Sequence, residues 1–246
     1  MKEMQVEIPT KAGRMGTFVC HPERGGPFAP IIIYMDAPGM REELRDFARR
    51  LGTAGYAVLL PDLYYRTPAF VPIDTSKLTP DSPERMRMSE QIKTIDIPKI
   101  MDDTEGMLKY IDGQPQLKKR PIGCVGYCMS GQYAVHAAAR YPGRVTAAAS
   151  IYGVRLMTDQ PDSPHLAARQ TEAELYFACA EVDHWVPLEQ IDALRASLKA
   201  ADVDAEVELY PGVEHGFAFP ARPAYNKAAA ERHWTRLFAL FRRRLG

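Results

Sequence analysis

Short apolar runs and amphipathic stretches alternate along most of this chain, and each pattern predicts a different element. Residues 31–35 and 56–60 are apolar runs without polar alternation, which is typical of parallel strands buried on both faces. Residues 41–51 instead place apolar side chains three and four positions apart, which predicts a helix with one buried face. The sequence therefore predicts strands and helices in turn.

The same patterns extend toward both ends of the chain. Residues 4–9 and 15–20 flank a Lys-Ala-Gly turn and are expected to form a hairpin. Further strands are expected at 121–125, 145–152, 175–180 and 205–210, and further helices at 97–111, 132–140, 186–200 and 224–245. This alternation predicts an α/β fold with a mostly parallel central sheet and helices on both faces.

The length of 246 residues suits one large α/β domain, and we expect a single domain over residues 1–246. Residues 66–83 are rich in Pro, Thr, Ser and Asp, which indicates a long excursion from the regular pattern. We interpret the whole stretch 66–95 as an insertion near the functional site. A second domain is the less favoured alternative.

The segment that points most directly to chemistry is Gly126-Tyr-Cys128-Met-Ser-Gly131, between a predicted strand and a predicted helix. A reactive residue between small residues at such a turn is the nucleophile elbow of α/β-hydrolases. The turn strains the backbone of the nucleophile, and only small side chains fit two positions before and two after it. Gly126 and Ser130 meet that demand. We therefore expect Cys128 to be a nucleophile in a three-layer α/β-hydrolase fold, whereas an isolated cysteine would more often be a small buried apolar residue.

A thiol is mostly protonated at neutral pH and needs a base to become a nucleophile. In α/β-hydrolases the chain order is nucleophile, acid, histidine. Asp183 and His215 follow Cys128 in that order, and each comes directly after a predicted strand, at the edge where open α/β sheets form their sites. We expect Asp183 to orient His215 and His215 to act as the base. The alternative for Asp183 is a helix cap, with Glu181 as the rival acid.

Two backbone N–H groups are needed to stabilise the oxyanion of the reaction. One is expected from Met129, the residue after the nucleophile, and the other from the loop after the third strand. In that loop Ala37 can donate and Pro38 cannot. Asp36 stands beside this donor, either as an ordinary loop residue or as a carboxylate that faces the thiol.

Charge and composition exclude several classes of protein. Basic and acidic residues number 31 each, so the net charge gives no support to a nucleic-acid partner or an anionic membrane. We expect no signal peptide and no membrane span, and the four cysteines, which form no disulfide framework, suit a reducing cytoplasm. No spacing of His or Cys matches a metal site, so we expect no metal and no other cofactor.

Four motifs together resemble the dienelactone hydrolase family (carboxymethylenebutenolidases) over about residues 5–240. They are Gly126-Tyr-Cys-Met-Ser-Gly131, Gly55-Tyr-Ala-Val-Leu-Leu-Pro-Asp-Leu-Tyr64, Asp183-His-Trp-Val-Pro187 and Glu214-His-Gly-Phe217. The resemblance implies a Cys-Asp-His triad, carried here by Cys128, Asp183 and His215. It also implies an acidic residue, usually glutamate, that pairs with the cysteine at rest and activates it when substrate arrives. Asp36 holds that position.

The chain departs from this family where the substrate is recognised. Family members that hydrolyse dienelactone grip its carboxylate with two arginines, of which Arg85 is one candidate. The other should lie four residues past the histidine, where this chain has Phe219, and Arg222 is a candidate substitute. A more apolar pocket would suit a neutral or hydrophobic ester or lactone. Candidate lining residues, for each of which ordinary packing is the alternative, are Met35, Tyr64, Tyr65, Trp185, Phe217 and Phe219.

The sequence thus predicts a carboxylic ester or lactone hydrolase that acts on a small molecule, as a monomer or homodimer. One rival is a non-catalytic α/β-hydrolase scaffold that binds small molecules. Another is a thiol redox enzyme that uses Cys128. The redox enzyme would need a resolving cysteine, and Cys124 is expected to point into the sheet instead.

Overall fold

The computed structural model describes residues 1–67, 73–79 and 81–246, so part of the predicted excursion at 66–95 lies outside the described residues. The chain divides into two compact units, Met1–Lys119 and Arg120–Gly246, and each is described by itself. The expected single domain over residues 1–246 stays a prediction.

The first unit contains four strands, in the spatial order β1, β2, β4, β3, among its described residues. They are β1 (Lys2–Thr10), β2 (Gly13–His21), β3 (Pro30–Tyr34) and β4 (Ala57–Pro61). The β1–β2 hairpin is antiparallel, as predicted, and β2 also runs antiparallel to β4. The β3 and β4 strands are parallel, and every residue of both is buried, which confirms the interpretation of their unbroken apolar runs.

Helices α1 (Glu42–Thr53) and α3 (Ile97–Asp112) pack against the strands of this unit. The acidic Glu42 and Glu43 stabilise the first turn of α1, because negative charge interacts favourably with the positive end of the helix dipole. In α3 a Cβ atom at Gly106 would come within 2.8 Å of the Pro9 carbonyl, so glycine is required for this close approach to β1.

The excursion contains regular structure that the sequence analysis did not anticipate. A short 3-10 helix, η1 (Thr75–Lys77), precedes the helix α2 (Pro83–Ile92). Two residues at its start could have predicted α2 from the sequence. Ser82 caps the helix by accepting a hydrogen bond from the Arg85 N–H, and Pro83 occupies the first turn. The abundance of Pro, Thr and Ser in the neighbouring residues obscured this cap.

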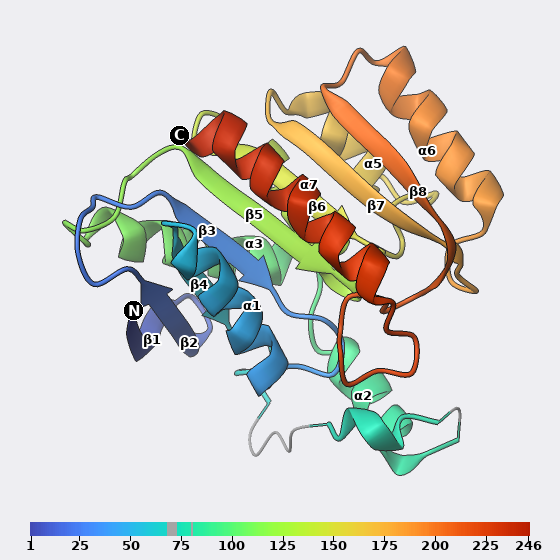
Figure 1. The fold of residues 1–246 in the computed structure, drawn as a ribbon, viewed down its shortest axis with the longest axis horizontal. Helices are drawn as coiled ribbons and strands as arrows, with labels where there is room; N and C mark the ends of the chain where they lie inside the picture. Colours follow the sequence, from blue (N-terminus) through green and yellow to red (C-terminus); the bar gives the residue numbers. More distant parts are fainter. Residues whose placement is uncertain (68–72, 80) are drawn as a thin grey trace. The chain divides into compact units, whose positions relative to one another are not determined.

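The second unit contains four parallel strands in sequence order (Figure 1). They are β5 (Ile122–Tyr127), β6 (Val145–Ile151), β7 (Glu174–Val182) and β8 (Ala205–Glu214). The helices of this unit are η2 (Cys128–Ser130), α4 (Gly131–Arg140), α5 (Pro164–Ala167), η3 (Ala168–Gln170), α6 (Leu188–Ala200) and, after the last strand, α7 (Lys227–Leu245). The short η2, α5 and η3 were not predicted as helices, η2 being part of the predicted turn, whereas the other elements match the predicted ones to within a few residues.

Two glycines of β5 show that helices cover both faces of these strands. A Cβ atom at Gly123 would lie 2.8 Å from the Phe241 ring on α7. At Gly126, three residues on, a Cβ atom would lie 2.0 Å from the carbonyl oxygen of Ser130, at the start of α4. Side chains an odd number of positions apart on a strand point to opposite faces, so α7 and α4 lie on opposite sides.

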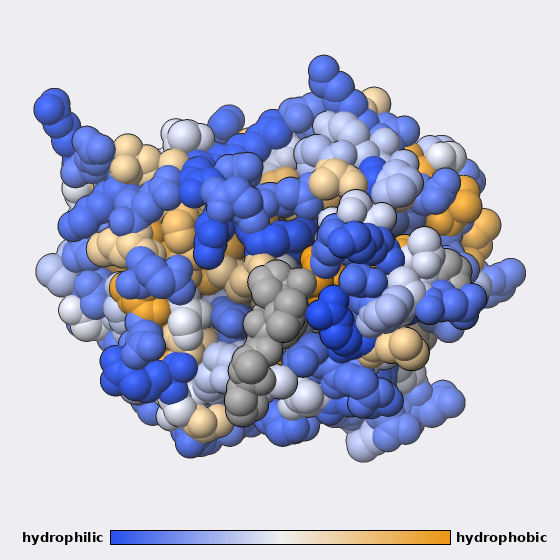
Figure 2. Space-filling model, turned by 90° about the horizontal axis from the view of Figure 1, so that it is seen from below, coloured by the Kyte–Doolittle hydropathy of each residue, from blue (hydrophilic) through white to orange (hydrophobic). Residues whose placement is uncertain are grey.

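Figure 2 shows one face of the surface coloured by hydropathy. On the face drawn in Figure 2, hydrophilic residues predominate and hydrophobic ones are scattered among them. None of the helices in the described ranges has the length and apolar composition needed to cross a membrane.

Candidate active site

Cys128 lies at a strained turn between β5 and α4. Its φ is 56°, in the left-handed region that non-glycine residues rarely adopt. Two hydrogen bonds hold the turn: the Val154 N–H donates to the Cys128 carbonyl at 3.2 Å, and the Gln132 side-chain amide donates to the Met129 carbonyl at 2.8 Å. Strain that is held in place by surrounding contacts in this way is typical of a functional position.

The neighbours of Cys128 show why the turn requires small residues. The 2.0 Å approach of a Gly126 Cβ to the Ser130 carbonyl leaves no space for any side chain. A Cβ at Gly131 would lie 2.2 Å from the Ser150 hydroxyl and 2.7 Å from the Gly153 Cα. The close approach of strand and helix expected of a nucleophile elbow is therefore present, and Cys128 itself is partly exposed.

Asp183 and His215 come together at the carboxyl ends of β7 and β8. The Nδ1 atom of His215 lies 2.7 Å from the Oδ2 atom of Asp183, and both side chains are almost fully buried. The second carboxylate oxygen accepts a hydrogen bond from the Trp185 N–H at 2.9 Å. Asp183 therefore orients the imidazole and directs its other nitrogen, Nε2, away from the carboxylate.

The charge state of His215 depends on Cys128 as well as on Asp183. Burial of His215 disfavours the imidazolium, but the charges of Cys128 and Asp183 and the hydrogen bond with Asp183 outweigh burial and raise the pKa of His215 to about 9. Nε2 is buried and has no hydrogen-bond partner, sulfur included, among the described residues. Hydrogen bonds of catalytic groups are often long or poorly aligned before substrate binds, so this geometry is compatible with Cys128 as the partner of Nε2.

Two aromatic rings confine His215. The centroid of the Trp185 ring lies 4.6 Å from that of the imidazole, and the centroid of the Tyr152 ring lies 5.0 Å from it. Trp185 is 42% exposed, whereas Tyr152 is buried at the end of β6 with a φ of 38°. The sequence analysis missed Tyr152, although its place at the end of a predicted strand, the edge where sites form, was a usable signal.

Phe217 and Phe219 are fully buried, so neither exposes a surface to solvent. Phe217 stacks on Tyr210 with a centroid distance of 5.0 Å, and Phe219 packs against Tyr127 at 5.5 Å. The Arg222 guanidinium lies 5.2 Å from the centroid of the Phe219 ring. These rings support the residues on either side of His215, and their proposed contact with substrate stays a prediction.

In the first unit the structure places Asp36, Ala37 and Tyr64 in one buried cluster. The Arg41 guanidinium binds both carboxylate oxygens of Asp36, and the Tyr64 hydroxyl donates to the Ala37 carbonyl at 2.8 Å. The role of the Ala37 N–H as an oxyanion donor stays a prediction. The sequence analysis did not single out Arg41.

The other predicted lining residues of the first unit make contacts of their own. Met35 is fully buried, and the Tyr65 hydroxyl is 2.7 Å from Asp103 and 2.6 Å from Thr10. Arg85 lies in the first turn of α2 and is partly buried. Substrate contacts of these residues stay predictions.

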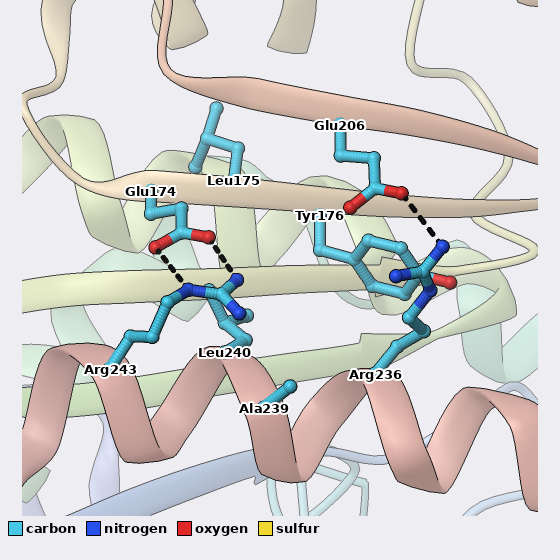
Figure 3. Close-up of a pocket in the computed structure, with 8 residues that line it drawn as sticks. All are labelled: Glu174, Leu175, Tyr176, Glu206, Arg236, Ala239, Leu240 and Arg243. Atoms are coloured by element: carbon cyan, nitrogen blue, oxygen red, sulfur yellow. Dashed lines mark hydrogen bonds and ion pairs between the residues drawn. The ribbon is translucent and has the colours of Figure 1, made fainter.

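A small cavity, partly open to solvent, lies among β7, β8 and α7 (Figure 3). Its cations are paired, Arg236 with Glu206 at 3.1 Å and Arg243 with Glu174. Glu174 begins β7, whereas Asp183 follows the end of that strand, roughly 30 Å away at about 3.3 Å per residue. The cavity is therefore remote from His215. Among the described residues, no cluster of three or more His, Cys, Asp or Glu could hold a metal ion.

The second unit holds a strained cysteine between a parallel strand and a helix. An aspartate and a histidine follow it in chain order and meet at later strand ends. This arrangement defines an α/β-hydrolase. The fold comparison agrees. A solved structure from Klebsiella pneumoniae, named "Putative Dienelactone Hydrolase", matches with a TM-score of 0.85 and 24% identity over 98% of both chains. The family model of the dienelactone hydrolase family matches residues 15–245, and the chain belongs to that family of hydrolases.

Curated relatives agree with this assignment. A protein of Methylorubrum extorquens named "Putative carboxymethylenebutenolidase" is 28% identical over 97% of this chain and 80% of its own length. A Synechocystis protein of the same name is 26% identical over 100% of this chain and 98% of its own. The predicted family and fold class are thus confirmed.

Proposed function

We propose that this protein hydrolyses carboxylic esters or lactones through a Cys-Asp-His triad formed by Cys128, Asp183 and His215. The observation that carries the proposal is the coupling of His215 to both partners. Asp183 holds Nδ1 at 2.7 Å, and the charge of Cys128 contributes to raising the pKa of His215 to about 9. A histidine that stays protonated beside a cysteine stabilises the thiolate, which is the nucleophilic form of the residue.

The reaction would proceed in two stages. The Cys128 thiolate attacks the carbonyl carbon, the oxyanion is stabilised by the N–H groups of Met129 and Ala37, and the alcohol leaves with a proton from His215. The resulting thioester is hydrolysed when His215, oriented by Asp183, takes a proton from water. Each preorganised N–H donor would lower the barrier by about 3 kcal/mol.

The leaving group limits the range of substrates. A thiolate is expelled more easily than an amide nitrogen, so a tetrahedral adduct formed from an amide would mostly revert. Esters and lactones with stable leaving groups, such as enols and phenols, are therefore favoured. This agrees with the carboxymethylenebutenolidase names of the relatives and with a Bradyrhizobium relative, 24% identical, named "Probable 2-oxo-3-(5-oxofuran-2-ylidene)propanoate lactonase".

The residues near His215 favour an uncharged substrate over one with a carboxylate. Phe219 occupies the position of the second expected arginine and is fully buried. The partly exposed Trp185 beside His215 instead offers an apolar surface at the reacting group. A neutral ester or lactone suits these residues better than dienelactone itself.

The direct test is the hydrolysis of p-nitrophenyl acetate by a Cys128→Ala variant. Activity should fall by at least about 10⁴-fold, because removal of a triad nucleophile leaves only binding and the oxyanion donors. Cys179→Ala is the matched control, since Cys179 is a buried cysteine of β7 in the same unit, and its activity should be retained. Hydrolysis retained by a folded Cys128→Ala variant would exclude the triad.

Alkylation of Cys128 distinguishes the proposed hydrolase from a non-catalytic binder, and a second assay addresses the thiol redox enzyme. Rapid reaction of Cys128 with iodoacetamide near neutral pH is expected of the hydrolase, whereas an inert thiol would favour a non-catalytic binder. The redox rival is opposed by Cys124, which is fully buried within β5 and so poorly placed to resolve an oxidised Cys128. Peroxide consumption by the protein would contradict this argument.

A further inference from the structure

The loop that follows β6 lies against the turn at Cys128, within the second unit. The Val154 N–H of this loop donates to the Cys128 carbonyl at 3.2 Å. Gly153, one residue earlier, lies close to Gly131 at the start of α4, because a Cβ at Gly131 would come within 2.7 Å of the Gly153 Cα. The loop and the turn are therefore in direct backbone contact, which the absence of side chains at both glycines permits.

The same loop is held in an uncommon conformation. Tyr152 has a φ of 38° and Arg155 a φ of 58°, both in the left-handed region that non-glycine residues rarely adopt. The Tyr152 N–H donates to the Ala178 carbonyl of β7 at 2.7 Å, and the Leu156 carbonyl accepts from the His165 N–H at 3.0 Å. Such conformations persist only where surrounding contacts hold them. Bonds at both ends of the loop thus fix the Val154 N–H between them.

The bond to Cys128 acts on the following residue as well. The Cys128 carbonyl and the Met129 N–H belong to one planar peptide group and point in opposite directions. A bond that fixes the carbonyl therefore also fixes the direction of the N–H. The next peptide group carries the Met129 carbonyl, which accepts from the side-chain amide of the buried Gln132 at 2.8 Å. Both peptide groups that flank the Cα of Met129 are thus held by hydrogen bonds.

We infer that Gln132 is a positioning residue and that the loop 152–156, through the Val154 N–H, is a positioning element, and that together they aim the Met129 N–H at the oxyanion. The inference rests on the proposed hydrolysis, in which Met129 supplies one of the two donors. A donor of this kind is effective because it already points to the place where negative charge develops. Gln132 and Val154 act through the backbone of the turn and need no contact with the substrate.

The first test is a Gln132→Met substitution. Methionine is similar in length and favours a helix, but its side chain has no N–H to donate to the Met129 carbonyl. We expect kcat for p-nitrophenyl acetate to fall about 10-fold with KM little changed, because the donor acts mainly in the transition state. Gln190→Met is the matched control, since Gln190 is exposed in the first turn of α6, and it should keep full kcat.

The second test uses two substitutions at Val154. Proline at this position has no N–H, whereas alanine keeps the N–H and removes only the end of a partly buried side chain. Val154→Pro should lower kcat by about 10- to 100-fold, since a misdirected donor loses much of the effect of an absent one. Val154→Ala should retain the wild-type kcat.

Alkylation by iodoacetamide distinguishes an effect on the donor from an effect on the thiol. This reagent loses iodide from a saturated carbon, so no oxyanion forms during the reaction. Gln132→Met and Val154→Pro should therefore be alkylated at the wild-type rate near neutral pH. The other three cysteines are buried, and Cys128→Ala supplies the background. A general distortion of the turn would change kcat and the alkylation rate together.

Three contrary results have distinct meanings. Full kcat in Gln132→Met would overturn the inference, whether or not Val154→Pro folds, and so would full kcat in a folded Val154→Pro protein. A parallel loss of kcat and of alkylation would show that these contacts hold the thiol and not the donor, which also overturns it. Those results leave the triad standing, whereas hydrolysis retained by Cys128→Ala would remove the proposed function itself.

Discussion

The charge state of His215 can be tested by an Asp183→Asn substitution. An ordinary histidine has a pKa near 6.5, and in the folded protein Cys128 and Asp183 raise the value for His215 to about 9 against the opposing effect of burial. A difference of roughly 2.5 pKa units corresponds to about 3 kcal/mol of preference for the imidazolium.

The sign of the pH dependence follows from this shift. Because the pKa is higher in the folded state, the imidazolium stabilises the fold fully below about pH 6.5, and this stabilisation is lost as the pH rises through about 9. Asp183→Asn removes one of the charges that raise the pKa. It should lower the free energy of unfolding by about 1–2 kcal/mol at acidic pH and by much less above about pH 9.5.

The same substitution should impair activity more than stability. The side-chain amide of asparagine presents an N–H to Nδ1, which favours the tautomer with the proton on Nε2, the wrong one for a base facing Cys128. We expect kcat to fall by about 10³- to 10⁴-fold, by analogy with the corresponding substitution in serine triads.

Urea unfolding of the wild type and Asp183→Asn at about pH 6, 7.5 and 9.5 measures the stability effect. Asp192→Asn is the matched control, because Asp192 is exposed and forms only a surface ion pair with Arg195. It should change the free energy of unfolding by under about 1 kcal/mol at every pH. A difference between Asp183→Asn and the wild type that stays constant from pH 6 to 9.5 would refute the argument that Asp183 helps to keep His215 charged.

Two other substitutions test the turn and the aromatic surroundings of His215. Gly126→Ala would place a Cβ 2.0 Å from the Ser130 carbonyl, so it should lower the melting temperature strongly and abolish esterase activity, whereas Gly16→Ala, whose nearest contact would be 3.6 Å, should be tolerated. An active, stable Gly126→Ala protein would contradict the close packing of this turn. Trp185→Ala should raise KM for p-nitrophenyl phenylacetate by about 3- to 10-fold with a smaller effect on the acetate, because it removes the partly exposed ring beside His215. Equal effects on both esters would show that Trp185 does not contact the acyl group.

Local sequence was enough to predict most of the fold. Parallel strands buried on both faces need continuous apolar runs, and β3 and β4 are such runs with every residue buried. The turn at Cys128 was also predictable, because close approach of strand and helix leaves space only for a glycine at position 126. Cys128, Asp183 and His215 were predicted from the chain order of nucleophile, acid and histidine in α/β-hydrolases. Each follows a predicted strand, and parallel strands bring their carboxyl ends to one edge.

Other features depended on contacts that no local pattern contains. The sequence does not tell an aromatic residue that packs from one that faces a ligand, and Phe217 and Phe219 proved fully buried while Trp185 is 42% exposed. Tyr152 follows β6 and His215 follows β8, and the parallel pairing of β6, β7 and β8 brings these two strand ends to the same edge. Arg41 binds Asp36 because it precedes α1 in an extended conformation, with φ −158° and ψ 171°, and because burial of the carboxylate demands a cation. Local sequence patterns were enough to predict most of the elements and to single out the residues that we propose for the chemistry. Tertiary packing decided what each side chain touches, because burial and charge compensation depend on residues far apart in the chain.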